Sequence, residues 1–364
     1  MVRISRSVAP CLGVAFLIAA CGSDSPKTSV STASSPGPSA SSGASSGSSG
    51  GTAGTPPPTT AADASTPNGP STLLPGSDSG LPTSTDATPP GADAAAVSTG
   101  VLPPITDPGA AGPFTPTETQ NTGPSGNYTT IAPMELGQGG IKNPILVFGP
   151  GAGAWPAIYQ TLLNHIASHG FVIVAYNSTP QGPELQTAMD WIVSESTRQG
   201  SIYFNKVDTT KIAAAGQSAG SLAVFNIAND PRLTTTIHIN GGTFAPHTAE
   251  KNLVKVAEFI CGDDPDGGYA GDEARPNCDA DFQMATTPIW NGDVIGASHT
   301  TIIDNPLGGT SPTDPLKKPF LAATVAWLRW QLAGDQTMKS LFVGSNCGYC
   351  QQTSTWTVQQ KNLQ

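Results

Sequence analysis

The sequence predicts an α/β fold in which a mostly parallel β-sheet carries helices on both faces, and two observations support this. From about residue 128, short apolar runs of strand length alternate with longer stretches that have helical periodicity. Strands that are separated by helices in this way pair in parallel. The second observation is a break in composition, because the preceding part of the chain is nearly all Ser, Gly, Thr, Pro, Ala and Asp. We therefore expect one folded domain at residues 128–364, preceded by a disordered tether.

The first twenty residues have the features of an export signal. Arg3 and Arg6 give a positive start, and the apolar run that follows is too short to span a bilayer as a mature helix. The run ends in Ala20 and Cys21, which resembles the bacterial lipobox, where the cysteine becomes a lipidated N-terminus. We expect lipidation of Cys21 and membrane contact through this anchor, although an ordinary secretory signal is the alternative. The resemblance to lipoproteins of diderm bacteria implies that Gly22, rather than Asp, after the cysteine favours the outer membrane or cell surface.

Residues 21–127 have the composition of a flexible tether. They contain almost no aromatic or β-branched clusters, so they cannot bury enough apolar surface to offset the entropy cost of ordering. Proline-rich stretches such as Pro56–Pro58 stiffen it locally. We expect this segment to hold the domain at some distance from the membrane.

Within the domain, the apolar patterns predict secondary structure in alternation. Helices should lie on both faces of the sheet, because strand–helix–strand units of this kind form parallel crossovers. The predicted strands are residues 145–148, 171–176, 211–215, 235–239, 254–260 and 289–294, and the predicted helices are residues 155–168, 184–199, 221–228 and 319–333.

Residues 216–220 read Gly-Gln-Ser-Ala-Gly and fit the pattern G-x-S-x-G. The pattern alone is weak evidence, since residues 43–47 of the tether also match it. The match at Ser218 differs because it directly follows a predicted strand and opens a predicted helix, which is the setting of a nucleophile elbow in α/β hydrolases. A glycine-rich turn before an ordinary helix is the alternative. We predict Ser218 as a nucleophile.

A serine hydroxyl needs a base, and His299 is the candidate among five histidines. In the α/β-hydrolase fold the order along the chain is Ser, acid, His. His165 and His169 precede the serine, and we place them on a helix surface or end. His238 lies inside a predicted strand as a core residue, and His247 follows too soon to leave room for an acid strand. His299 lies in a loop after the last of the predicted strands, where the base belongs.

The acid should follow the strand at 254–260, where three carboxylates compete. We predict Asp264, which would orient the imidazole and stabilise the imidazolium. Asp263 or Asp266 could serve instead, and a solvated acidic turn or a weak cation site is the alternative for the cluster.

The negatively charged intermediate of acyl transfer needs two backbone donors. We predict the amide of Ala219, directly after the nucleophile. The second donor should come from the glycine-rich loop at residues 149–154, where glycines allow close approach to a substrate, and we assign Ala152. A phosphate-binding loop is the alternative, but the loop lacks the Lys-Ser/Thr ending of a P-loop.

Four cysteines remain after Cys11 leaves with the signal and Cys21 takes the lipid. An even number in an exported domain indicates two disulfides, for which three pairings exist. We favour the local pairing because each pair is close in sequence: Cys261–Cys278 and Cys347–Cys350. The second pair also fits a redox motif, but one C-x-x-C near a C-terminus is too little for a thioredoxin-like or zinc site.

The sequence resembles the bacterial cutinase and PET-hydrolase group, close to dienelactone hydrolases and plasma-type platelet-activating-factor acetylhydrolases. The resemblance covers about residues 145–335. It implies a lidless α/β hydrolase that acts on carboxylic esters, with polyesters among the candidates, and it places Ala152 at the first oxyanion position and Ser218, Asp264 and His299 on the triad. The matching motifs are P-G-x-x-A at residues 150–154, A-S-H-G-F-V at 167–172, F-x-C-x-x-D at 259–264 and G-A-S-H at 296–299.

Three departures from this group bear on substrate specificity. The elbow is G-Q-S-A-G instead of the common G-H-S-M-G, and residues 267–276 form an insertion. The tryptophan that clamps substrate in the group has no clear counterpart, and Phe244 is the nearest candidate.

These features together predict an exported, monomeric carboxylic ester hydrolase that works through an acyl-enzyme, without metal or organic cofactor. The net charge of −10 and the lack of a basic stripe argue against a nucleic-acid partner. The main alternative is a catalytically silent surface protein that uses the scaffold for binding. A redox protein that uses Cys347 and Cys350 is a second alternative.

Overall fold

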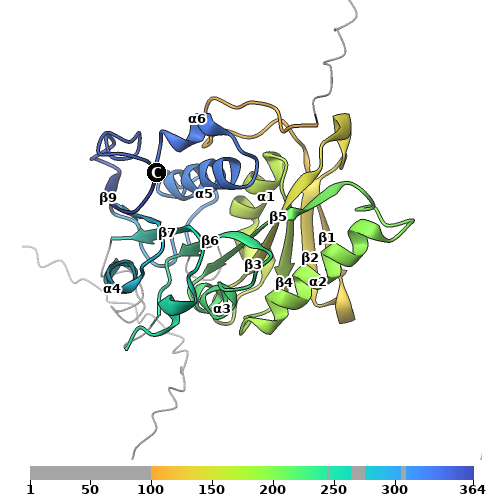
Figure 1. Ribbon diagram of the computed structural model, residues 1–364, viewed down its shortest axis with the longest axis horizontal. Coiled ribbons are helices and arrows are strands. Elements are labelled where there is room, and N and C mark those ends of the chain that lie inside the picture. The colour runs from red at the N-terminus through yellow and green to blue at the C-terminus, as the bar shows by residue number, and fades with distance from the viewer. Residues whose placement is uncertain (1–99, 244–245, 264–274, 305–308) are drawn as a thin grey trace, which may run out of the picture. The chain divides into compact units, whose positions relative to one another are not determined.

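The computed structural model describes residues 100–243, 246–263, 275–304 and 309–364, and a nine-stranded sheet runs through them (Figure 1). The strand order is β1-β2-β4-β3-β5-β6-β7-β8-β9. The strands from β4 to β8 in this order pair in parallel, whereas β1 and β2 at one end and β9 at the other pair antiparallel. The predicted mostly parallel α/β fold is confirmed. The strands are β1 Pro116–Thr122, β2 Tyr128–Pro133, β3 Asn143–Gly149, β4 Val172–Tyr176, β5 Val207–Gln217, β6 Leu233–Ile239, β7 Ala257–Gly262, β8 Ile289–Val294 and β9 Trp356–Lys361.

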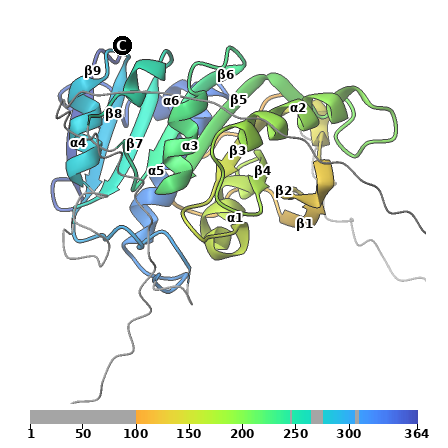
Figure 2. The ribbon, with the colours of Figure 1, turned by 90° about the horizontal axis from the view of Figure 1, so that it is seen from below.

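Helices cover both faces of the sheet, and alternate residues of each strand face opposite layers (Figure 2). In β3, Leu146 and Phe148 pack towards α1 and α5, whereas Ile145 and Val147 pack towards α2 and α3. Because both faces are buried, the central strands read as continuous apolar runs. The helices are α1 Gln160–Ser168, α2 Pro183–Thr197, α3 Ala219–Ile227, α4 Arg275–Met284, α5 Lys317–Gln331 and α6 Gln336–Lys339.

The folded domain begins earlier than the sequence predicted. The range 21–127 was assigned to the tether, but β1 pairs along β2 and the residues before it are packed. Leu102 belongs to the main apolar core, and the carbonyl of Pro103 accepts a hydrogen bond from the buried Arg329 guanidinium at 2.7 Å. The boundary at residue 128 is therefore wrong, because the polar composition of this segment concealed an edge strand. Residues 1–99, which include the predicted signal and Cys21, lie outside the described residues.

His165 and His169 anchor this leading segment to the end of α1. His165 Nε2 lies 2.8 Å from the carbonyl oxygen of Pro108, and His169 Nε2 lies 3.0 Å from that of Ala110. His169 is fully buried, and burial lowers its pKa to about 4. The histidine of the A-S-H-G-F-V motif thus has a structural role, as expected for histidines that precede the nucleophile.

Both local disulfides are present, Cys261–Cys278 and Cys347–Cys350. The first joins β7 to α4, a helix that begins within the predicted insertion and that the sequence did not predict. No helix among the described residues is long and apolar enough to cross a membrane.

Candidate active site

Ser218 occupies the sharp turn between β5, the central parallel strand, and α3. Its backbone has φ 54° and ψ −122°, a conformation that non-glycine residues rarely adopt. Its amide donates to the carbonyl of Ile239 on the next strand at 3.0 Å, which fixes the turn against β6. A strained serine between a strand and a helix N-terminus is the geometry predicted for the elbow.

Close packing explains the glycines on either side of the serine. A Cβ atom on Gly216 would lie 2.3 Å from the carbonyl of Gly220, and one on Gly220 would lie 1.9 Å from the carbonyl oxygen of Gly149. Both distances are far inside van der Waals contact, so a side chain at either position would force the elbow apart. Only glycine therefore fits at these two positions.

The predicted oxyanion loop lies directly against the nucleophile. A Cβ atom on Gly151 would lie 2.5 Å from Gln217 Oε1 and 3.3 Å from Ser218 Cβ. Thr179 stabilises the loop through two hydrogen bonds. Its hydroxyl donates to the carbonyl of Gly151 at 2.8 Å and accepts from the amide of Gly153 at 2.9 Å. Ala152 stands exposed between these two glycines, and Ala219 is the first residue of α3. Both predicted donors thus belong to segments that adjoin Ser218.

Gln217, which the sequence marks only as a departure from the common G-H-S-M-G elbow, links this loop to His299. Its Oε1 accepts from the Tyr159 hydroxyl at 2.7 Å, and that hydroxyl accepts from the amide of Gly151 at 3.0 Å. Its Nε2 lies 3.3 Å from His299 Nε2 and 3.2 Å from the His299 carbonyl oxygen. Both Gln217 and His299 are buried. The structure therefore brings the predicted base next to the residue that precedes the nucleophile.

Asn240 is a second residue that the sequence did not single out. It follows β6 with φ 44° and is fully buried. Its side-chain nitrogen donates to the carbonyl of His299 at 3.0 Å, and its side-chain oxygen accepts from the amide of Gly262 at 2.7 Å. It thereby fixes the histidine loop relative to the end of β7, where the acid loop begins. An asparagine in a turn-like Asn-Gly-Gly stretch gave no signal for this role.

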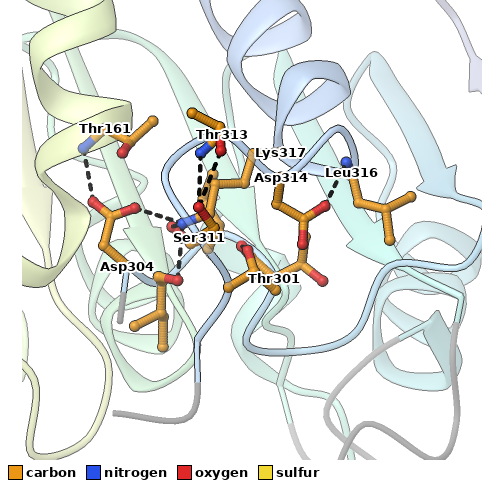
Figure 3. A network of polar contacts seen from close by, with 11 residues as sticks. Thr161, Thr301, Asp304, Ser311, Thr313, Asp314, Leu316 and Lys317 are labelled. Carbon is orange, nitrogen blue, oxygen red and sulfur yellow. Dashed lines mark hydrogen bonds and ion pairs between the residues drawn. The ribbon is translucent and has the colours of Figure 1, made fainter. Parts of the chain in front are cut away.

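A buried ion pair holds the far end of the histidine loop (Figure 3). Lys317, at the start of α5, places its ammonium 2.5 Å from Asp304 Oδ1 and 2.9 Å from the carbonyl oxygen of Ile303. The other carboxylate oxygen of Asp304 accepts from the amide of Thr161 at the start of α1 at 2.8 Å. The lysine is 1% exposed, so the pair is shielded from solvent. The loop that carries His299 is consequently fixed to two helices.

The predicted acid, Asp264, lies outside the described residues, as do the alternative Asp266 and the proposed clamp residue Phe244. Asp263 is described, and its Oδ1 accepts from the amide of Gly296 at 2.6 Å. This carboxylate therefore stabilises the turn before His299.

The other histidines have separate environments. His238 is fully buried in β6 between Ser221 Oγ, 3.0 Å from Nδ1, and Thr236 Oγ1, 3.0 Å from Nε2. It is the core histidine that the sequence predicted, and burial lowers its pKa to about 3. His247 instead lies beside Glu250 and Asp281, the one group of residues in the described part of the chain whose side chains could together hold a metal ion.

Comparison with known proteins identifies one family. Residues 103–267 match the family model described as PET hydrolase-like. Among curated proteins, none matches the chain. The matched segment includes the predicted oxyanion loop, the turn at Ser218 and the end of β7.

Proposed function

Since the folded domain of this chain belongs to the PET hydrolase-like group of α/β hydrolases, we propose that the protein is an exported serine hydrolase that cleaves carboxylic esters. The observation that carries this proposal is the strained backbone of Ser218 between β5 and α3, with His299 beside the preceding residue.

In the proposed reaction, Ser218 attacks the ester carbonyl while His299 takes its proton. The amides of Ala152 and Ala219 stabilise the oxyanion. His299 then protonates the leaving alcohol, and water attacks the acyl-enzyme in the same way. Asp264 orients the imidazole.

Both small and polymeric esters belong to the proposed substrate class. Thr243, directly before Phe244, is buried and engaged in a polar cluster. Because Thr243 is only 2% exposed, it presents no surface to a substrate, and it favours neither small nor polymeric esters. Release of soluble products from polyester film would show that polymers are attacked as well.

The test is hydrolysis of a short and a medium p-nitrophenyl ester series by the whole chain. Ser218→Ala should abolish turnover, whereas Ser221→Ala, three residues further on, should retain it. The chain-length profile of the wild type would narrow the substrate.

Equal, near-background rates in the wild type and Ser218→Ala would exclude a simple esterase. That result would favour the alternative of a hydrolase-fold binding protein at the cell surface.

Export and anchoring belong to the same proposal and depend on Cys21. In a diderm bacterial host, the wild type should fractionate with membranes, and Cys21→Ser should not. Equal membrane recovery of both would contradict a lipid anchor.

A further inference from the structure

Four polar side chains meet in a buried cluster between the segment after β6 and α4. Thr243, His247 and Glu250 come from the segment, and Asp281 comes from the helix. His247 Nδ1 lies 3.0 Å from Asp281 Oδ1 and 3.9 Å from Glu250 Oε1. Thr243 Oγ1 lies 2.6 Å from Asp281 Oδ1 and also bonds Glu250. One donor atom from each of His247, Glu250 and Asp281 lies within 4.8 Å of the other two.

The charges in this cluster are not balanced by the protein. Glu250 is 4% exposed and Asp281 is fully buried. Among the described residues, neither carboxylate forms an ion pair with a lysine or an arginine, and His247 can supply at most one positive charge. Burying two carboxylates so close together is costly unless a cation or a proton compensates them.

The donor set fits a divalent cation. Two carboxylate oxygens and one imidazole nitrogen form a mixed oxygen and nitrogen set of the kind that binds Zn²⁺ or Mn²⁺, whereas Ca²⁺ prefers oxygen alone. The side chain of His247 is 19% exposed, which leaves a path from solvent.

A neighbouring donor gives independent support. Asn277 lies one turn before Asp281 on α4, and a Cβ atom on Gly242 would contact both side chains. Asn277 is 7% exposed, and its amide nitrogen has no hydrogen-bond partner among the described residues. Water bound to a cation beside Asp281 would supply the missing acceptor.

We propose that His247, Glu250 and Asp281 bind a divalent transition-metal cation, with Zn²⁺ as the first candidate. The cation would link the segment after β6 to α4. That segment borders the elbow, because a Cβ atom on Gly241 would lie 2.9 Å from the carbonyl oxygen of Ser218. The helix is already joined to β7 through Cys278. The bound ion would therefore stabilise one wall of the candidate active site without taking part in ester cleavage.

The test is calorimetric titration of the chelator-treated whole chain with ZnCl₂, MnCl₂ and CaCl₂, without substrate. We expect one site for Zn²⁺ or Mn²⁺, weaker binding of Ca²⁺, and a higher melting temperature with the bound ion. Asp281→Asn and Glu250→Gln should weaken binding at least about tenfold. Asp279→Asn, on the same helix but outside the cluster, should bind as the wild type does.

His247→Ala gives a second variant that alters a partly exposed residue outside the regular elements, so it should fold even if Asp281→Asn does not. Cobalt substitution adds a spectroscopic readout, because d–d absorption reports nitrogen and oxygen ligation. The proposal is overturned if the wild type binds none of the three cations. It is equally overturned if the cluster variants bind zinc as tightly as Asp279→Asn does, which would mean an adventitious ion only.

Discussion

Gln217 joins the two halves of the candidate active site through one buried side chain. Its amide nitrogen faces His299 Nε2, and its oxygen receives the hydroxyl that supports Gly151. The Gln217 amide nitrogen can only donate, so this contact places the His299 proton on Nδ1, and the serine hydroxyl must displace the amide from Nε2 before the ring can accept its proton. Gln217 therefore contacts both the predicted base and the residues that support the predicted oxyanion loop.

We predict that Gln217→Leu lowers kcat for ester hydrolysis at least about fivefold with a smaller change in KM, because a hydrogen bond of this kind contributes about 1 kcal/mol or more. Steady-state kinetics of the variant and the wild type measure the changes in kcat and KM separately. Gln360→Leu, far from the elbow, is the control. Equal loss in both variants, or a change in KM alone, would argue against a positioning role.

His238 makes stability depend on pH. Burial lowers its pKa in the folded protein to about 3 from an ordinary value of 6.5. The unfolded chain therefore binds a proton first as the pH falls, so the stabilisation from the neutral ring is complete above about pH 6.5 and is lost progressively below it.

We predict that the difference in free energy of unfolding between the wild type and His238→Asn decreases by about 2 kcal/mol from pH 7 to pH 5. Each pH unit below 6.5 lowers the free energy of unfolding of the wild type by about 1.4 kcal/mol. Urea unfolding at the two pH values measures this gap, and contributions from other groups cancel in the difference. A gap that stays constant with pH would mean that the buried ring does not titrate as proposed.

At the scale of elements, the sequence predicted the strands that are apolar because they are buried. The strands β3 to β8 were predicted because they are buried on both faces and therefore apolar. The strands β1, β2 and β9 were missed. The side chains of β1 and β9 are largely exposed or half-buried and polar, whereas β2 is buried but contains two threonines and ends in a proline, so it shows no apolar run. The helix α4 was missed for the same reason.

The candidate site likewise contains residues that the sequence predicts and residues that it does not. The candidate nucleophile and the candidate base follow from a local motif and from chain order. The roles of Gln217 and Asn240 depend on contacts with residues 82 and 59 positions away. No local pattern encodes such contacts. The cluster around His247 likewise needs Asp281, 34 positions further along the chain.

The ion pair between α5 and the histidine loop gives a prediction at this scale. Lys317→Met should lower the free energy of unfolding by about 3 kcal/mol, because it leaves the Asp304 carboxylate buried without its partner. It should also lower kcat, because the loop that carries His299 loses its attachment to α5. Urea unfolding and ester hydrolysis measure the two effects.

The double variant Lys317→Met with Asp304→Asn is the matched control. It removes both charges, so it should recover part of the lost stability. Additive losses from the two changes would show that the pair is not coupled.

For the whole domain, the leading segment determines whether the sheet has a protected edge. All six residues of β2 are buried, and β1 covers one side of this strand. The residues before β1 also pack, through Leu102 in the core and through the backbone carbonyls that bind His165 and His169. Without them, the backbone of β2 would become an unpaired sheet edge, which is a site for aggregation.

We therefore predict that a chain beginning at residue 100 melts as one cooperative unit, whereas a chain beginning at residue 128 melts at a markedly lower temperature or is recovered as aggregate. Thermal unfolding and size-exclusion chromatography compare the two. The polar composition of residues 100–127 would suggest that they can be removed without loss, because polar segments bury little surface. Their contribution to the stability of the domain comes instead from backbone pairing along β1 and from a few buried residues, such as Leu102. Truncation therefore tests whether these contacts stabilise the domain despite the polar composition of the segment. Equal melting temperatures for the two chains would place the domain boundary at residue 128 after all.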